Sequence, residues 1–321
     1  MRILVTGTTG FIGSELVVRL AEEGHEVYSL ERYVTGRYVL CRTRNVRSVF
    51  ADLRDAFAVR QALRETQPEA VIHLASVSPV SYSYDHPNEV MDTNLTGTIN
   101  LIEGCLREVP HFRHFLFAST SETYGNGPSP KIEETPQLPN SPYSVSKLAA
   151  EKYVLYMRDA YRLPVTILRP FNTYGRKGNT HFVVERMVVQ MLSGTEVRLG
   201  SPNPVRDLLY VDDHVSAYLT CLCNEKAVGE VFNFSTGRGV TILELASILQ
   251  KLTRSPREIA WDTIPRRPLD IEELIGDSSK AERLLGWRPR VTLEAGLART
   301  VEFWHGRIDR AETRAASATV A

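Results

Sequence analysis

The chain has 321 residues, of which 43% are hydrophobic and 24% are charged, so it has enough apolar material for one large core or two fused cores. Its 38 lysines and arginines balance 38 acidic residues, which argues against a general nucleic-acid-binding surface. No apolar run is long enough to span a membrane, and the first residues lack a signal-peptide pattern, so we expect a cytoplasmic protein without membrane contacts. Four scattered cysteines and no histidine cluster predict neither a disulfide framework nor a metal site.

The first half of the sequence alternates short apolar runs with amphipathic segments, which predicts strands connected by helices. We expect strands at 2–7, 26–31, 48–53, 70–76, 114–119 and 165–170, and helices at 11–24, 55–66, 88–108 and 143–161. Continuous apolar strands are typical of a parallel sheet that helices cover on both faces. The predicted fold class is therefore α/β, with a doubly wound parallel sheet of the Rossmann type.

After residue 170 the pattern changes, because loops lengthen, prolines become frequent and the candidate strands are short. These strands are at 196–200, 206–211 and 231–235. We expect a smaller C-terminal α/β substrate-binding lobe that folds onto the first domain. The predicted organisation is an NAD-binding Rossmann domain at 1–170, a second lobe that comprises mainly 171–308, and a flexible tail at 309–321, where residues are small and polar without apolar periodicity.

The sequence GTTGFIG lies between the first predicted strand and the first predicted helix. It places Gly7, Gly10 and Gly13 in G-x-x-G-x-x-G spacing, with Phe11 and Ile12 where the helix begins. A tight turn, a close approach of backbone to ligand and close helix packing each need a residue without a Cβ. The helix N-terminus then offers N–H groups and a partial positive charge to a pyrophosphate. The motif therefore predicts a dinucleotide-binding site.

The residues after the second and third predicted strands indicate which dinucleotide binds. Glu31 ends the second strand, where a carboxylate accepts hydrogen bonds from ribose hydroxyls and repels a 2′-phosphate, which favours NAD. Arg32 follows directly and would suit a 2′-phosphate, so NADP stays open as the less favoured cofactor. Asp52 is placed to reach an adenine amino group, although an ordinary loop acid has the same placement.

Tyr143 and Lys147 are four residues apart in a predicted helix, so they share one face of it. A free tyrosine has a pKa of about 10 and is a poor base at neutral pH. A nearby ammonium stabilises the phenolate and lowers that pKa, so the pair can take a proton from a substrate hydroxyl while a hydride leaves its carbon. This pair follows the glycine motif and the fifth strand, which makes it more specific than an isolated Tyr-x-x-x-Lys.

Together with Thr120, these motifs resemble the extended short-chain dehydrogenase/reductase family, in its branch of sugar-nucleotide epimerases and dehydratases. The resemblance covers about residues 1–305 and includes HLAS (73–76), DTNLTGT (92–98), RPFNTYG (169–175), RDLLYVDD (206–213), FNFSTG (232–237) and DSSKAERLLGWRP (277–289). It implies an enzyme that retains its nicotinamide cofactor, oxidises C4 of a nucleotide-linked hexose and then acts on the 4-keto intermediate. It also implies a homodimer that pairs through helices 88–108 and 143–161.

The resemblance further implies roles for single residues. Tyr143 would be the base, Lys147 would hold the nicotinamide ribose, and Thr120 would bind the C4 oxygen. The implied cofactor groove adds Leu53, Leu74, Ala75, Ser76 and Asn94. The implied substrate-binding residues are Ser83, within the loop 78–87, and Asn172, Arg206 and Arg267, which match positions that contact the nucleotide diphosphate. We expect the loop 78–87 and the segment 176–205 to line the sugar pocket.

Glu122 separates the reactions that this branch performs. In an extended chain, a glutamate two residues after Thr120 lies on the same side as the threonine, near C5 of the sugar. A base there supports 4,6-dehydration, whereas epimerisation needs none. The Thr120-Ser121-Glu122 triplet resembles GDP-mannose and UDP-N-acetylglucosamine 4,6-dehydratases and lacks the aspartic acid of dTDP-glucose 4,6-dehydratases, so Glu122 would also have to protonate the leaving group.

The resemblance therefore favours a nucleotide-sugar 4,6-dehydratase, and three alternatives stay open. The first is a 4-epimerase. The second is a UDP-glucuronate decarboxylase, because those enzymes also carry Thr-Ser-Glu. The third is a nucleotide-binding sensor on the same scaffold, which would be expected to lack Tyr143, Lys147 or Thr120.

Overall fold

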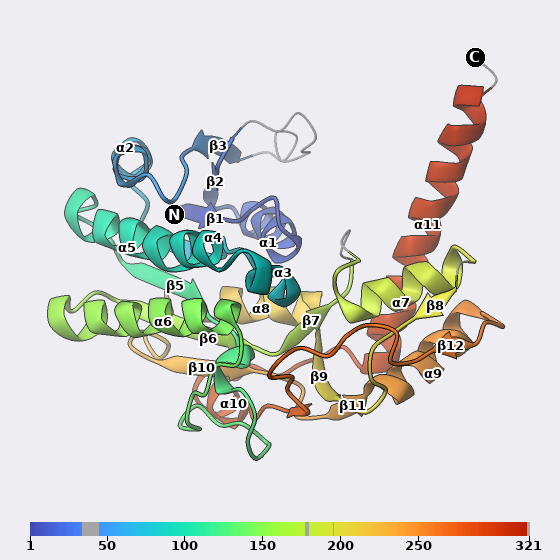
Figure 1. Cartoon of the computed structure of the whole chain (residues 1–321). Coiled ribbons are helices and arrows are strands. Elements are labelled where there is room, and N and C mark those ends of the chain that lie inside the picture. Colours follow the sequence, from blue (N-terminus) through green and yellow to red (C-terminus); the bar gives the residue numbers. More distant parts are fainter. Residues whose placement is uncertain (34–44, 177–179, 195, 320–321) are drawn as a thin grey trace.

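A seven-stranded parallel sheet forms the centre of the computed structural model, which describes residues 1–33, 45–176, 180–194 and 196–319 (Figure 1). Its strand order is β10-β6-β5-β4-β1-β2-β3, and every neighbouring pair is parallel. The strands are β1 (Arg2–Thr6), β2 (Glu26–Glu31), β3 (Val46–Phe50), β4 (Ala70–His73), β5 (His114–Ala118), β6 (Val165–Pro170) and β10 (Val231–Phe234).

Helices cover both faces of this sheet, because successive apolar residues of each strand point to opposite sides. In β1, Ile3 and Val5 pack in one core cluster with residues of α1 (Phe11–Glu22) and α8 (Val211–Cys221). Leu4 packs in the other cluster with residues of α2 (Ala56–Thr66), α5 (Gly97–Glu108) and α6 (Pro142–Tyr161). Figure 1 shows α5 and α6 side by side on this second face. The predicted doubly wound α/β fold is confirmed.

The predicted helix 88–108 is divided into three parts. Helix α4 (Pro87–Met91) leads into a π-helical turn, Asp92–Thr96, which leads into α5. A π-helical turn inserts one residue into the helical repeat, and such turns are frequent at functional sites. The loop 78–87, expected to be irregular, contains the short helix α3 (Val80–Asp85).

The second lobe is built around a small sheet with the order β11-β9-β13, in which β7 also pairs with β9. These strands are β7 (Asn172–Tyr174), β9 (Val205–Tyr210), β11 (Gly239–Thr241) and β13 (Glu273–Leu274). A separate pair joins β8 (Val197–Arg198) to β12 (Ile259–Ala260). The helices of this lobe are α7 (Val183–Leu192), α9 (Ile242–Thr253), α10 (Ser279–Leu285) and α11 (Leu293–Thr319).

The chain returns to the first domain after residue 170. Strand β10, from the part of the sequence expected to lie mainly in the second lobe, pairs with β6 at the edge of the main sheet. Helix α8 packs on α1. The apolar run of β10 explains this placement, since Phe232 and Phe234 are fully buried in the main core.

The segment 309–321, expected to be a flexible tail, is helical as far as Thr319. Helix α11 continues to Thr319 and extends away from the rest of the molecule (Figure 1). The segment AETRAASAT is rich in alanine, glutamate and arginine, which are strong helix formers.

Among the described residues, no helix combines the length and the apolar character needed to cross a membrane. Within the same ranges, no three histidine, cysteine or carboxylate side chains are gathered to hold a metal ion. Cys105 and Cys221 are buried free thiols and Cys223 is partly buried, whereas Cys41 lies outside the described residues.

Truncation separates the two halves of α11. Removing residues 309–321 should change the melting temperature by no more than about 2 °C, because the buried residues described for α11 all precede residue 309 and are kept. Removing all residues after Thr292 should destabilise the protein strongly, since Leu297, Thr300 and Val301 are buried. Calorimetry of both truncated proteins is the measurement. An equal loss of stability in both would contradict the assignment.

Candidate active site

The turn between β1 and α1 is built from glycines that leave no room for side chains. Gly7 has a φ of +73°, and a Cβ on it would lie 2.7 Å from the backbone nitrogen of Ala75. A Cβ on Gly13 would lie 2.2 Å from the carbonyl oxygen of Gly7. Gly10 is the N-cap of α1, and no side chain of the described residues caps that end. The first turn of α1, with Phe11 and Ile12, therefore presents backbone N–H groups that suit a pyrophosphate.

Glu31 is held in place at the carboxyl end of β2. Its Oε1 accepts hydrogen bonds from the hydroxyls of Ser29 and Ser48, both at 2.9 Å, and Ser29 also contacts the Thr8 hydroxyl at 2.5 Å. The second carboxylate oxygen is left for a ligand. Arg32 lies over the ring of Tyr33, with the guanidinium 4.9 Å from the ring centroid. The structure thus fixes the acid at the strand end, whereas the arginine packs against its neighbour Tyr33.

The carboxylate of Asp52 is paired with a neighbouring arginine. This carboxylate forms a bidentate pair with Arg54, with a closest distance of 2.6 Å, and this arginine lowers the pKa of Asp52. Leu53 is buried beside it, and the carbonyl oxygen of Leu53 accepts from the Asn100 side chain at 2.8 Å. An adenine contact by Asp52 would have to share the carboxylate with Arg54.

The π-helical turn places Asn94 beneath the loop that follows β4. Its side chain accepts from the Val77 N–H at 2.8 Å and donates to the Val77 carbonyl at 3.2 Å and to the Ser146 hydroxyl at 2.9 Å. Asn94 therefore links this loop to α6 instead of pointing freely into the groove. The loop itself, with Leu74, Ala75 and Ser76 all partly buried, lies over the glycine turn, and the Ala75 N–H donates to the Thr6 hydroxyl.

A buried histidine supports this arrangement. His73 ends β4 and hydrogen-bonds with Thr6 at 2.7 Å and with Thr98 of α5 at 2.9 Å. Burial, reinforced by Lys147, lowers the pKa of His73 to about 3, so the ring is neutral. The histidine thus connects β1 and β4 to the helix that carries the π-helical turn.

Tyr143 and Thr120 meet at the carboxyl end of the sheet. Tyr143 is on the first turn of α6 and is 9% exposed, and the Thr120 side chain lies close to its phenol. Burial raises the pKa of Tyr143, the Thr120 contact opposes this, and Glu122 raises the pKa further. Lys147 is not among the groups that shift it, so the expected lowering by this lysine is not met, because burial dominates.

Lys147 is a desolvated ammonium one turn farther along α6. Burial lowers the pKa of Lys147 to about 7, although Glu151 acts in the opposite direction. Its Nζ lies 4.4 Å from the centroid of the Phe117 ring and hydrogen-bonds with no described residue. Its donors are therefore available to a ribose hydroxyl. Together with the glycine turn and Glu31, Lys147 completes a groove whose residues fit a nicotinamide dinucleotide.

The segment after Thr120 is a 3₁₀ turn, Ser121–Tyr124, and not the extended chain from which its geometry was predicted. The Thr120 hydroxyl caps this turn by accepting from the Glu122 N–H at 3.2 Å. Glu122 still lies near Tyr143, whose pKa its charge raises. Ser121 is buried, and its hydroxyl has no hydrogen-bond partner among the described residues.

Glu122 lies within a group of opposite charges. Burial raises the pKa of Glu122, Arg206 and Arg267 oppose this, and Asp270 adds to it. Arg206 is itself mostly buried on β9, and its guanidinium donates to the Ile271 carbonyl at 2.8 Å. Arg267 is exposed on the connection between β12 and β13. The predicted diphosphate residues and the predicted base are thus neighbours.

The other two predicted substrate residues differ in whether their polar atoms already have hydrogen-bond partners. Asn172 begins β7, and its buried Oδ1 has no hydrogen-bond partner in the described part of the chain, so it is free to bind a ligand. Ser83 is fully buried in α3 and donates its hydroxyl to the Val80 carbonyl at 2.6 Å. Of the segment 176–205, residues 177–179 and 195 lie outside the described residues.

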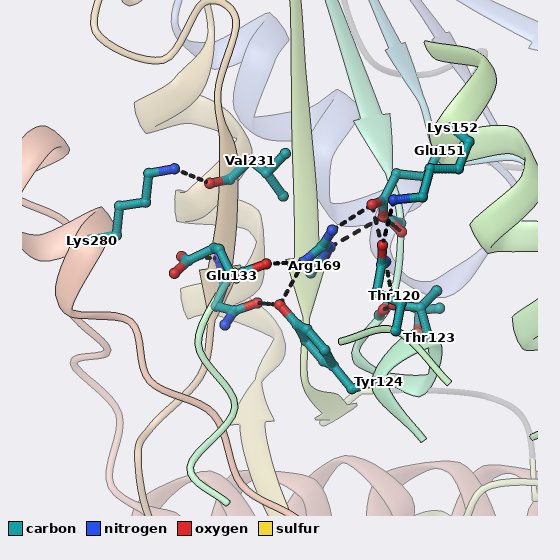
Figure 2. Close-up of polar contacts among 12 residues, drawn as sticks. Thr120, Thr123, Tyr124, Glu133, Glu151, Lys152, Arg169, Val231 and Lys280 are labelled. Atoms are coloured by element: carbon teal, nitrogen blue, oxygen red, sulfur yellow. Dashed lines mark hydrogen bonds and ion pairs between the residues drawn. The ribbon is translucent and has the colours of Figure 1, made fainter. Parts of the chain in front are cut away.

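A buried ion pair that sequence reasoning missed lies beneath these residues (Figure 2). Arg169, at the end of β6, contacts both carboxylate oxygens of Glu151 on α6, with a closest distance of 2.5 Å, and the two side chains are 4% and 0% exposed. Figure 2 shows Arg169 between Glu151 and the pair Tyr124 and Glu133. The two members of the ion pair belong to α6 and β6, so no local spacing in the sequence indicates the pair.

The remaining polar atoms of the pair are also satisfied. Glu151 accepts from the hydroxyl of Ser119 at 2.5 Å and from the side chain of Gln137 at 3.1 Å. Arg169 donates to the Tyr124 hydroxyl at 2.7 Å and to the Glu133 carbonyl at 2.9 Å. A buried pair is stable only when such additional bonds are made.

Comparison with known proteins finds a family model and relatives that match this chain over most of its length. The family model described as GDP-mannose 4,6 dehydratase matches residues 4–300. A UDP-glucose 4-epimerase of Mycolicibacterium smegmatis is 33% identical to this chain, and the match covers 96% of this chain and 99% of that relative. A dTDP-glucose 4,6-dehydratase of Xanthomonas campestris is 32% identical, covering 94% of this chain and 92% of the relative.

Solved structures agree with these relatives. The crystal structure of UDP-glucose 4-epimerase from Thermotoga maritima with UDP-glucose has a TM-score of 0.89 and 35% identity, covering 96% of this chain and all of that one. The dTDP-glucose 4,6-dehydratase of Streptomyces venezuelae, with NAD bound, has a TM-score of 0.87 and 30% identity, covering 95% and 97%. The resemblance predicted from the motifs and the prediction of NAD are confirmed.

Substituting Gly13 tests the dinucleotide groove. Gly13→Ala should weaken NAD binding by about tenfold or more, because its Cβ would overlap the Gly7 carbonyl and displace the turn. Titration of the apoprotein with NAD measures this affinity. Gly200→Ala is the control, since a Cβ there would find its nearest heavy atom at 3.9 Å, and its affinity should equal that of the wild type. Equal affinities in all three proteins would reject the groove.

The buried pair can be tested by a double-mutant cycle. Arg169→Met and Glu151→Leu should each lower the free energy of unfolding by about 3–5 kcal/mol, because each leaves the other charge buried without its partner. The double variant should lose less than the sum of both. Urea unfolding measures all three. Single-variant losses below about 1 kcal/mol would show that the pair is not a structural requirement.

Proposed function

This chain belongs to the GDP-mannose 4,6-dehydratase family, a family of NAD-dependent nucleotide-sugar dehydratases and epimerases, and from that premise we propose that it is a nucleotide-sugar 4,6-dehydratase. The product would be a nucleotide-linked 4-keto-6-deoxyhexose. The observation that carries this choice is the position of Glu122, a half-buried carboxylate near Tyr143 and the two arginines Arg206 and Arg267.

The first half of the reaction uses the residues common to the whole family. The groove residues would hold NAD, which would supply the acceptor for the C4 hydride and the donor that returns it to C6 as C5 regains a proton. Tyr143 takes the proton of the C4 hydroxyl, while the neighbouring Thr120 contacts the same oxygen. Lys147 would hold the nicotinamide ribose with donors that no described residue uses.

The second half depends on Glu122. The 4-keto group acidifies the C5 proton, and Glu122 takes this proton while the C6 hydroxyl leaves as water. Burial raises the pKa of Glu122, which makes its carboxylate a stronger base and its protonated form more persistent. Ser121 is buried and cannot act as a strong acid. Glu122 therefore both takes the proton and delivers it to the leaving hydroxyl.

The substrate would be a hexose joined to a nucleoside diphosphate. Guanidinium groups match phosphate oxygens, and Arg206 and Arg267 are the predicted contacts. The unpartnered Oδ1 of Asn172 is an acceptor that a substrate hydroxyl or N–H can satisfy. We also propose a homodimer, because α6 carries exposed Val145, Tyr156 and Tyr161, whose burial against a second copy would be favourable.

A 4-epimerase is the second candidate, favoured by the similarity to the UDP-glucose 4-epimerases of Mycolicibacterium smegmatis and Thermotoga maritima. This reaction would use Tyr143, Lys147 and Thr120 in the same way. The 4-keto sugar would then turn over in the site and be reduced on its other face, so Glu122 would have no chemical role.

One experiment distinguishes these reactions. The NAD-loaded enzyme is incubated with GDP-mannose, UDP-N-acetylglucosamine, UDP-glucose, dTDP-glucose and UDP-glucuronate, and the products are weighed by mass spectrometry. Loss of one water supports the dehydratase. A new isomer of unchanged mass indicates the epimerase, and loss of carbon dioxide indicates a decarboxylase. NAD binding without turnover of any of the five indicates a binding protein.

Glu122→Gln should stop the dehydratase after its first step. The amide cannot take the C5 proton, but Tyr143 and Lys147 remain, so the variant should still oxidise C4 and produce NADH absorbance in a single turnover. Release of the dehydrated product should fall by at least about a hundredfold. Tyr143→Phe is the control and should produce no NADH. Normal turnover by Glu122→Gln would reject the dehydratase assignment.

A further inference from the structure

The seven residues 266–272, named the strap here, form the second part of the connection between β12 and β13 and pass near Glu122 of the candidate active site. The strap carries Arg267 and Asp270, the two charges that act on Glu122 together with Arg206. It contains no helix or strand, and Leu269 at its centre is 60% exposed. The position of these two charges therefore depends on whatever holds the strap.

Side chains from the catalytic lobe hold the backbone of the strap. The Asn140 amide donates to the Leu269 carbonyl at 2.6 Å. The Asn126 amide donates to the Asp270 carbonyl at 2.9 Å and accepts from the Glu272 N–H at 3.1 Å. Among the described residues, no backbone–backbone hydrogen bond reaches residues 266–271.

Asn126 binds the strap as a neighbouring strand would. A side-chain amide offers N–H donors and a carbonyl acceptor, the two kinds of group that a peptide backbone offers. By using both on residues 270 and 272, Asn126 replaces a missing rung of a β-ladder. Such a contact can be made and broken easily, because one exposed neutral hydrogen bond contributes little net free energy.

Both asparagines are close in sequence to the reacting groups. Asn126 follows Glu122 by four residues, and Asn140 precedes Tyr143 by three. The backbone of Asn140 is fixed at the start of α6, since its N–H donates to the Ser144 hydroxyl at 3.0 Å. Its carbonyl accepts from the hydroxyl of Tyr84 on α3 at 3.1 Å. Asn140 thus joins the catalytic helix, the loop 78–87 and the strap.

We propose that Asn126 and Asn140 are positioning residues that clasp the strap to the catalytic lobe and so fix Arg267 and Asp270 beside Glu122. The part of this inference that concerns a nucleotide sugar rests on the proposed function. The clasp holds Arg267 where a diphosphate can reach both it and Arg206.

The clasp is tested on the NAD-loaded, full-length protein without substrate. Asn126→Ala, Asn140→Ala and Asn140→Asp are compared with Gln61→Ala, which truncates an exposed amide on α2 far from the site. Hydrogen exchange is followed in the peptide that contains Glu272, and limited trypsin digestion is followed after Arg266. Both rates should rise by about tenfold in Asn126→Ala, which loses two bonds.

The Asn140 variants should behave alike, because an aspartate has the shape of asparagine but no donor for the Leu269 carbonyl, and Gln61→Ala should match the wild type. With a nucleotide sugar that the wild type converts, KM should rise by about tenfold in the Asn126 and Asn140 variants, while kcat changes less than threefold, because Tyr143 and Lys147 are untouched.

Wild-type exchange and digestion rates in both alanine variants would overturn the clasp, and so would faster exchange with an unchanged KM. Loss of kcat together with a lower melting temperature would show a general structural role instead, and would also overturn it. If the wild type converts no nucleotide sugar, the proposed function fails. The exchange and digestion rates then decide alone, with faster rates supporting the clasp and unchanged rates rejecting it.

Discussion

The buried ion pair between Arg169 and Glu151 is the constraint on which the rest of the site depends. Two charges removed from water are tolerated only if each keeps a full set of partners. The pair takes these partners from Ser119 after β5, from the 3₁₀ turn through Tyr124, and from Gln137 and Glu133 in the following loop. These segments cannot shift independently without leaving a buried charge unpaired.

This constraint explains how α6 is positioned. Glu151 is one helical turn beyond Lys147, which is one turn beyond Tyr143, so anchoring Glu151 to β6 fixes the height of both reactive groups above the sheet. The same anchor holds the turn that contains Glu122. The position of the candidate active site thus depends on an ion pair that is itself buried beneath it.

The site also contains an opposition between burial and reactivity. Burial lowers the pKa of Lys147, which favours a neutral amine, and raises that of Tyr143, which favours a neutral phenol. Proton transfer by this pair therefore needs the additional charges and hydrogen bonds that a substrate and Thr120 provide. Pairing of Arg206 and Arg267 with phosphates would also withdraw the charges that hold down the pKa of Glu122, so substrate binding would strengthen the base.

Much of the fold and the site could be predicted from local pattern. The glycine motif, the apolar strands and the Tyr143–Lys147 spacing each reflect a constraint that acts within a few residues. The π-helical turn could not be predicted, because its extra residue is imposed by the contacts of Asn94 with Val77 and Ser146. Nor could the 3₁₀ turn at Glu122, which depends on the Thr120 cap, or the Arg169–Glu151 pair, whose members belong to different elements.

Strand β10 has a consequence for how the chain is made. Strand β6 lies between β5 and β10, so its outer edge has no partner until the ribosome has synthesised residues 231–234 and released them from its exit tunnel. Strand β6 carries Arg169 at its end, so the lining of the site waits for the same event. The nucleotide-binding half therefore cannot mature as an independent unit during translation. A gene fragment that stops at residue 170 would encode a sheet with an open, apolar edge, which favours aggregation.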